Sequence, residues 1–184
     1  CVLSMMDAAE LYEEEYAEGM QAAHGHDHDD HDHDDHDEDI GYDEHIWTSP
    51  VTAMTLCRVI ADALCEADPA NAEGYRVRLD DYLTRLAALD ETFRDIVAGA
   101  SRRLLVFGDR LKYLIDLVNE QHIPVVYTIE LSSRKVAQAI AETTGAQVRT
   151  FHSCQTVSRA EFDSGVTYLQ LMEANADALR EGLS

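Results

Sequence analysis

Basic residues are scarce in this sequence, and long apolar runs are missing. The 184 residues include 14 lysines and arginines against 36 aspartates and glutamates, which gives a formal net charge of −22 at pH 7. So acidic a chain repels phosphate backbones and anionic lipid headgroups. The composition therefore argues against nucleic acid and anionic membrane surfaces as partners. No apolar stretch approaches the roughly 20 residues that a membrane-spanning helix needs.

Cysteine is also sparse, with four residues at positions 1, 57, 65 and 154. None of them forms a Cys-x-x-Cys pair, so neither a thiolate zinc site nor a thioredoxin-like motif is supported. Cys57 and Cys65 fall in a helical pattern, where two turns separate them by about 12 Å, too far for a disulfide. We expect both on one buried helix face. Cys1 could be the lipid-modified first residue of a bacterial lipoprotein, but we favour a sequence that starts inside a domain.

What the chain has in abundance is histidine and aspartate, concentrated in residues 24–45 (HGHDHDDHDHDDHDEDIGYDEH). Nine acids fall between Asp27 and Asp39. With so little apolar surface to offset the entropy of ordering it, this stretch is predicted to be a mobile loop. A solvated acidic linker or a purification tag are the alternatives, although the tag is disfavoured by the interspersed aspartates and the internal position. Imidazoles and carboxylates are zinc ligands, so we expect metal capture by the loop histidines His24, His26, His28, His31, His33 and His36.

The segments after the loop have helical periodicity. Ser49 is a plausible N-cap with Pro50 at the first helical position, and this helix is predicted to end near Ala67. Asp68-Pro69 restarts the chain in the same way. The next amphipathic helix covers residues 69–98 and would be about 40 Å long. We expect it to pack along the sheet as a brace.

The remainder alternates between short apolar runs and amphipathic segments, which predicts an α/β fold with a parallel sheet, flanking helices and one long helix. Ligands of such sheets gather beyond the carboxyl ends of the strands. Those ends carry Asp109, Glu130 and His152. The expected strands are 104–107, 125–130 and 147–151, and the expected helices are 111–120, 133–144 and 158–182.

Residues 43–50 (DEHIWTSP) resemble the D-x-H-x-W-x-S-P signature of zinc and manganese substrate-binding proteins of ABC transporters. The long helix, the segment VFGD at 106–109 and the strand end at Glu130 follow in the order of that family. The resemblance implies two α/β lobes joined by a long helix, with the metal between them, and an extracytoplasmic protein that delivers zinc, or manganese, to a membrane permease. A His/Asp-rich loop is typical of the zinc-specific branch. On this resemblance the chain divides into an N-terminal lobe remnant (1–23), the loop (24–44), a helix after the ligand motif (45–68), the connecting helix (69–99) and the C-terminal lobe (100–184).

The same resemblance suggests metal ligands. His45 matches the ligand histidine of the signature, and His152 falls where the family has a ligand aspartate; otherwise His152 is an exposed loop histidine. Glu130 matches an acid near the site, which could bind the ion, orient a ligand or cap the following helix. Gly108 occupies the place of a usual ligand, and a strand and a helix of the family pattern are missing after Arg110. The ligand histidine of the N-terminal lobe has no counterpart.

Two functions follow from these expectations. The first is capture of extracytoplasmic zinc for an ABC permease, with His45, Glu130 and His152 within reach of one ion. The second is a metal buffer or storage protein, derived from a transporter component, that does not deliver its ions. A zinc-activated water between the same three residues would suit an enzyme, but no HExxH or other hydrolase signature is present, and we predict that the chain is not an enzyme.

Overall fold

The computed structural model describes residues 2–11, 42–107 and 111–184. The predicted loop histidines and Asp109 therefore lie outside the described residues. Within them, no helix is both long enough and apolar enough to span a bilayer. The elements are the 3-10 turns η1 (Met6–Ala8), η2 (Ile46–Thr48) and η3 (Pro69–Asn71), the helices α1 (Pro50–Ala67), α2 (Ala72–Ala98), α3 (Leu111–Glu120), α4 (Lys135–Thr144), α5 (Arg159–Ser164) and α6 (Tyr168–Leu183), and the strands β1 (Val106–Phe107), β2 (Val125–Thr128) and β3 (Gln147–Thr150).

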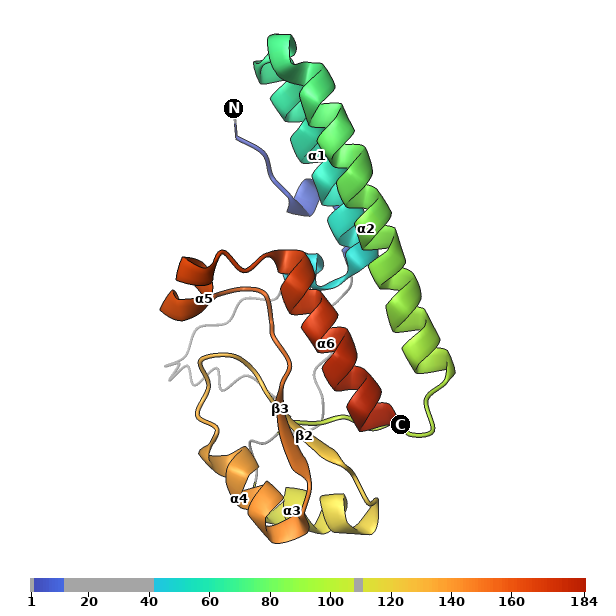
Figure 1. The fold of residues 1–184 in the computed structure, drawn as a ribbon, viewed down its shortest axis with the longest axis vertical. Helices are drawn as coiled ribbons and strands as arrows, with labels where there is room; N and C mark the ends of the chain where they lie inside the picture. Colours follow the sequence, from blue (N-terminus) through green and yellow to red (C-terminus); the bar gives the residue numbers. More distant parts are fainter. Residues whose placement is uncertain (1, 12–41, 108–110) are drawn as a thin grey trace, which may run out of the picture.

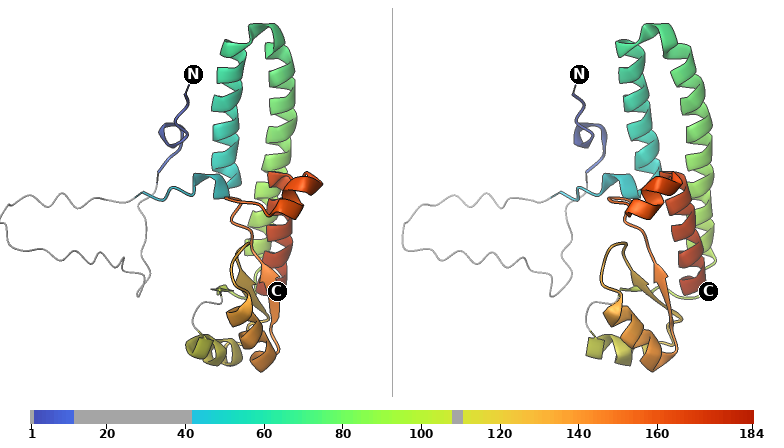
Figure 2. Two further views of the ribbon diagram at one scale, coloured as in Figure 1. Left: turned by 90° about the vertical axis from the view of Figure 1, so that its left-hand side faces the viewer. Right: turned by 60° about the vertical axis from the view of Figure 1, so that its left-hand side comes forward.

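Helices α1 and α2 form an antiparallel hairpin that extends away from the sheet (Figures 1 and 2). The start of α1 is as predicted: the Ser49 hydroxyl accepts a hydrogen bond from the Thr52 amide at 3.4 Å, and Pro50 is the first helical residue. The thiols of Cys57 and Cys65 are free. Both residues are half-buried, so the expected buried face of this helix is covered only in part at these two positions.

The long helix differs from the prediction in its start and in its neighbours. Residues 69–71 form a 3-10 turn, and α2 begins at Ala72. Leu86 and Leu89 of α2 are buried with Leu169 and Met172 of α6, and α6 in turn contacts β2 and β3. Helix α6 therefore separates α2 from the sheet, and the long helix does not lie along the strands as expected.

The three described strands are parallel, as predicted, and they lie in the order β1-β2-β3. Alternate side chains point to opposite faces, as the pleat requires. Val106 and Val126 face α3 and α4 in one core, whereas Val125 and Tyr127 face Ala178 of α6 in another. The lower part of the molecule is thus a three-layer α/β/α arrangement (Figure 1).

The ends of β2 and β3 bring two predicted residues together. Thr128 pairs with Thr150, so Glu130 and His152, each two residues further on, reach the same edge of the sheet. The predicted helix 158–182 is interrupted: Gly165 has a φ of 72°, which ends α5. Helix α6 then starts with Thr167 as its N-cap.

Candidate metal centre

His45 lies at the start of η2 and is oriented by an aspartate. Its Nδ1 lies 2.8 Å from Oδ1 of Asp43, and the same oxygen accepts the His45 backbone N–H at 2.8 Å. These two bonds lower the pKa of Asp43, and the bond from the His45 backbone N–H contributes most. A carboxylate can only accept, so Nδ1 carries the proton and the Nε2 lone pair is left free, the tautomer of a metal-binding histidine with a carboxylate partner. The His45 side chain is 56% exposed and lines a cavity of about 430 Å³ together with Asp43 and Glu10.

Trp47 connects this segment to the rest of the fold. Its ring lies 5.4 Å from the His45 ring, centroid to centroid. Its indole N–H donates to the carbonyl of Ser153, beyond β3, at 3.0 Å. Its own carbonyl accepts from the hydroxyl of Tyr168, the first residue of α6, at 2.7 Å. The backbone around His45 is therefore held by two elements of the C-terminal part of the chain.

Residues 152–156 form the strand-end loop, which follows β3, and Asn175 of α6 holds its first residue. The Asn175 side chain accepts the His152 amide at 2.6 Å and donates to the His152 carbonyl at 2.8 Å. Asn175 is 2% exposed. Further along the loop, Cys154 has a positive φ of 59°, and its amide points back at Nδ1 of the His152 ring, at 2.9 Å.

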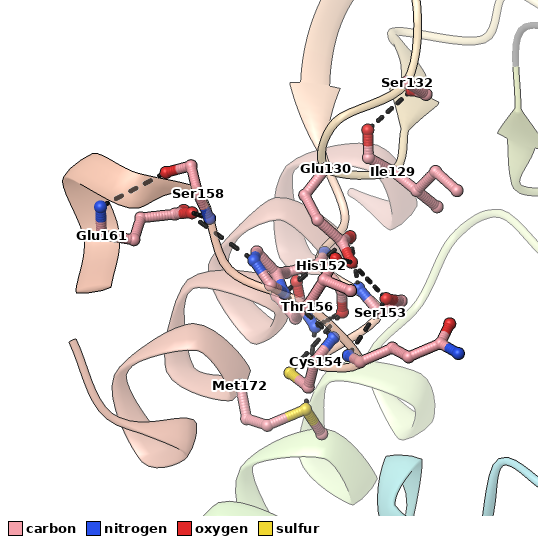
Figure 3. Close-up of polar contacts among 12 residues, drawn as sticks. Ile129, Glu130, Ser132, His152, Ser153, Cys154, Thr156, Ser158, Glu161 and Met172 are labelled. Atoms are coloured by element: carbon pink, nitrogen blue, oxygen red, sulfur yellow. Dashed lines mark hydrogen bonds and ion pairs between the residues drawn. The ribbon is translucent and has the colours of Figure 1, made fainter.

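Glu130 holds the same loop from the end of β2 (Figure 3). Its carboxylate accepts from the Ser153 amide at 2.8 Å, from the Ser153 hydroxyl, and from the Thr156 hydroxyl at 3.3 Å. Burial alone would raise the pKa of Glu130, but the bonds from the Ser153 hydroxyl and amide outweigh it and the pKa is lowered. Helix α4 starts at Lys135 without a side-chain cap, so the alternative role of Glu130 as its cap is wrong.

His152 is buried between two carboxylates, which contradicts the alternative of an exposed loop histidine. Its side chain is 6% exposed. Its Nδ1 lies 3.9 Å from Glu130, and its Nε2 lies 3.8 Å from Glu161 of α5 (Figure 3). Because the Cys154 amide donates to Nδ1, a neutral ring carries its proton on Nε2. That nitrogen has no hydrogen-bond partner among the described residues. The other oxygen of Glu161 accepts the Ser158 amide in a capping box, and the bonds with Ser158 lower the pKa of Glu161.

The structure thus brings Glu130 and His152 together at the strand ends, while His45 is linked to them through Trp47 and Ser153. Across residues 2–11, 42–107 and 111–184, no three His, Cys, Asp or Glu side chains are grouped so that they could hold a metal ion. Sequence reasoning missed Asn175, whose polar side chain interrupts the apolar face of α6. The signal that could have identified it is an amide side chain at a position of the helix that is expected to be buried.

Comparison with known proteins places these observations in a family. The family profile described as "zinc-uptake complex component A periplasmic" (ZnuA) matches residues 3–116 and 108–182. The high-affinity zinc uptake system protein ZnuA of Bacillus subtilis is 27% identical over 170 residues, which cover 77% of this chain and 53% of the relative. The zinc-binding protein AdcA of Streptococcus pyogenes is 25% identical over 168 residues, covering 76% of this chain and 33% of the relative. The chain therefore spans from a third to about half of the length of these relatives.

Solved structures agree on the fold. The metal-dependent lipoprotein YcdH of Bacillus subtilis superposes with a TM-score of 0.69 at 25% identity, over 78% of this chain and 65% of that protein. The Zn(II)-bound ZnuA-like domain of Streptococcus pneumoniae AdcA superposes with a TM-score of 0.67 over 77% of this chain and 64% of that one, and at 21% identity it shows the fold alone. The printed descriptions of these relatives are of metal binding and metal uptake, which agrees with the prediction that the chain is not an enzyme. The chain belongs to the ZnuA family of periplasmic zinc-uptake components.

Proposed function

We propose that this protein binds Zn²⁺ outside the cytoplasm and passes it to the permease of an ABC transporter. Family membership supports a role in metal uptake. The observation that carries the proposal is the pair of Asp43 and His45. The carboxylate fixes the proton on Nδ1, at 2.8 Å, and leaves Nε2 exposed with a lone pair for a cation.

His45 is the ligand that this proposal relies on most. Zinc takes four ligands, typically at 2.0–2.2 Å for nitrogen and oxygen donors, so His45 needs partners. The six histidines of residues 24–36 are proposed to supply imidazoles, weakly and in variable number. Glu130 and His152 join the same ion only if the strand-end loop rearranges. In the present arrangement the Glu130 carboxylate is engaged by Ser153 and Thr156, and the His152 Nε2 carries a proton.

Trp47 offers a direct test, because it is the one tryptophan of the chain and its ring lies 5.4 Å from the His45 ring. Zinc is titrated into the metal-free protein while tryptophan fluorescence is followed. We expect a saturable change in the parent and its loss in His45→Ala. His122→Ala is the matched control, since His122 is also exposed but follows α3, at the amino end of β2. A fluorescence response in His45→Ala that equals the parent response would contradict the proposal.

A metal buffer without delivery is the second candidate, and one observation favours it. The described residues form no group of three ligands, so high affinity is not built into them before the ion arrives. Competition against a chromophoric zinc chelator separates the two functions. One tightly bound ion together with several weakly bound ions supports capture for transport, whereas weakly bound ions alone support a buffer.

A further inference from the structure

We propose that Trp47 is a positioning residue for the zinc site: its indole N–H, bound to the Ser153 carbonyl, sets where His45 presents its free nitrogen. This inference rests on the proposed function, because it takes His45 to be a zinc ligand. It concerns the N–H group of the side chain and not the ring alone.

The Ser153 carbonyl, which accepts the Trp47 N–H, is held rigidly. The amide and the hydroxyl of Ser153 donate hydrogen bonds to Glu130. The preceding residue, His152, is bound through its backbone amide and carbonyl by the Asn175 side chain. Asn175 is buried in α6, and Glu130 lies two residues after the end of β2. The Ser153 carbonyl is therefore fixed relative to the sheet and to α6, and the Trp47 N–H that donates to it at 3.0 Å is fixed as well.

Only a short backbone segment separates Trp47 from His45. The two residues belong to one turn, in which the His45 carbonyl accepts both the Thr48 amide at 3.1 Å and the Thr48 hydroxyl at 2.7 Å. The Tyr168 hydroxyl holds the Trp47 carbonyl at 2.7 Å. The His45 side chain itself is more than half exposed and contacts the Trp47 ring. With so little packing of its own, His45 depends on this turn for its position, and the Trp47 N–H is the side-chain donor that ties the turn to the strand ends.

The hydrogen bond from Trp47 to Ser153 sets how much zinc affinity its loss should remove. A hydrogen bond of this kind contributes about 0.5–1.5 kcal/mol, and a change of about 1.4 kcal/mol is tenfold in an equilibrium constant. Loss of the N–H should therefore weaken zinc binding at the His45-dependent site by about two- to twelvefold. The fold should survive, since Tyr168 still holds the turn and the aromatic ring is retained.

The sharpest experiment replaces only the N–H. Because the chain has one tryptophan, a tryptophan-auxotrophic host can substitute Trp47 uniformly with benzothienylalanine, which keeps the bicyclic shape but has sulfur in place of N–H. 5-Fluorotryptophan, which keeps the N–H, is the matched control. Zinc affinity is measured on the full chain by competition with a chromophoric chelator. We expect about two- to twelvefold weaker binding with benzothienylalanine and parent affinity with 5-fluorotryptophan.

Trp47→Phe and Tyr168→Phe serve as second variants, with Tyr75→Phe as a control that removes an aromatic hydroxyl donor at the far end of the hairpin. Zinc affinity is measured well below the unfolding temperature of each variant. Trp47→Phe and Tyr168→Phe should bind zinc more weakly than the parent, and Tyr75→Phe should not. Parent affinity for the benzothienylalanine protein, whatever its unfolding temperature, overturns the inference, because a merely structural role leaves affinity unchanged in the folded protein. Zinc binding that does not depend on His45 at all overturns the proposed function as well, so the two failures can be distinguished.

Discussion

At the residue scale, Glu130 illustrates how the same side chain supports two different hypotheses. From the sequence it is a carboxylate at a strand end, where a metal ligand is expected. In the structure it accepts three hydrogen bonds from Ser153 and Thr156, and its side chain is only 8% exposed. When several hydrogen-bond donors surround a buried carboxylate, they fix its position. We therefore expect Glu130 to affect zinc binding through the strand-end loop.

A double-mutant cycle between Glu130→Gln and Ser153→Ala tests this expectation. If Glu130 acts through the loop, each variant should weaken zinc binding to a similar extent, and the double variant should be no worse than the more severe of the two. Chemical unfolding should show a loss of about 1–3 kcal/mol for Glu130→Gln, because a buried acceptor is altered. A zinc affinity that falls at least tenfold further in Glu130→Gln than in Ser153→Ala would instead identify Glu130 as a ligand.

Asp68, at the corner between α1 and α2, provides a prediction on pH. Its carboxylate accepts from the Asn71 side chain at 2.7 Å and from the Tyr75 hydroxyl at 3.1 Å, and these bonds lower its pKa below 3.8. Because the pKa is depressed in the folded protein, the bonds stabilise the fold above pH 3.8, and this contribution is lost as the pH falls through the folded pKa.

We expect Asp68→Asn to be less stable than the parent at pH 5–7, with the difference shrinking below about pH 4 as the parent carboxylate protonates. The measurement is urea unfolding across this range. A difference that is independent of pH would mean that the charge of Asp68 contributes nothing.

At the scale of elements, the approach of α6 to the sheet depends on one glycine. Tyr127 of β2 is 1% exposed and donates its hydroxyl to the Ala178 carbonyl at 3.0 Å. Gly182 lies against the same ring, and a Cβ at this position would overlap the Tyr127 hydroxyl oxygen and lie 2.9 Å from Cζ. The helix can pack this closely only because residue 182 has no side chain.

Gly182→Ala should therefore lower the free energy of unfolding by about 1–3 kcal/mol through overpacking. Gly99→Ala, where a Cβ would meet the Asp95 carbonyl at 3.3 Å and the Ile96 carbonyl at 4.0 Å, is the matched control and should cost less. Adding Tyr127→Phe to Gly182→Ala removes the overlapping oxygen and should recover part of the loss. Unfolding of Gly182→Ala at the parent denaturant midpoint would contradict the packing argument.

Several elements could be predicted because their signals are local. Pro50 after Ser49 marks a helix start, Gly145 marks a helix end, and β-branched runs mark buried strands. The alternation of strands with helices then predicted that the strands are parallel. The partner of α2 could not be predicted in this way, because its apolar stripe fits either a sheet or another helix. The division of the last segment at Gly165 was missed for a similar reason, since an isolated glycine does not by itself end a helical pattern.

Only part of the site was predictable from sequence. The carboxyl ends of neighbouring strands meet, so Glu130 and His152 were expected to approach each other, and they do. The sequence could not reveal which hydrogen bonds they make there. Those depend on the conformation of the strand-end loop, where Cys154 adopts a positive φ, and on Asn175, which reaches the loop from 23 residues away along the chain.

At the scale of the whole molecule, the family profile matches in two segments that overlap at residues 108–116. A strand and a helix of the family pattern were expected to be missing after Arg110, and this stays a prediction. Among the described residues, β1 has two residues and the sheet has three strands. The three described strands are covered on both faces, by α3 and α4 on one side and by α6 on the other, and a core lies on each side of the sheet.

Residues 24–39 carry six histidines and nine acids and lie outside the described residues. Deleting them should lower the number of zinc ions bound per chain and leave the circular dichroism spectrum and unfolding midpoint nearly unchanged, because the described cores contain none of these residues. A variant with all six histidines changed to glutamine keeps the charge and serves as the matched control. If imidazoles hold the ions, it should match the deletion, and the loop sites of the parent should weaken below about pH 6 as imidazoles protonate. If the glutamine variant keeps the parent stoichiometry, the carboxylates hold the zinc, and a deletion that leaves the stoichiometry unchanged would remove the loop from metal binding altogether.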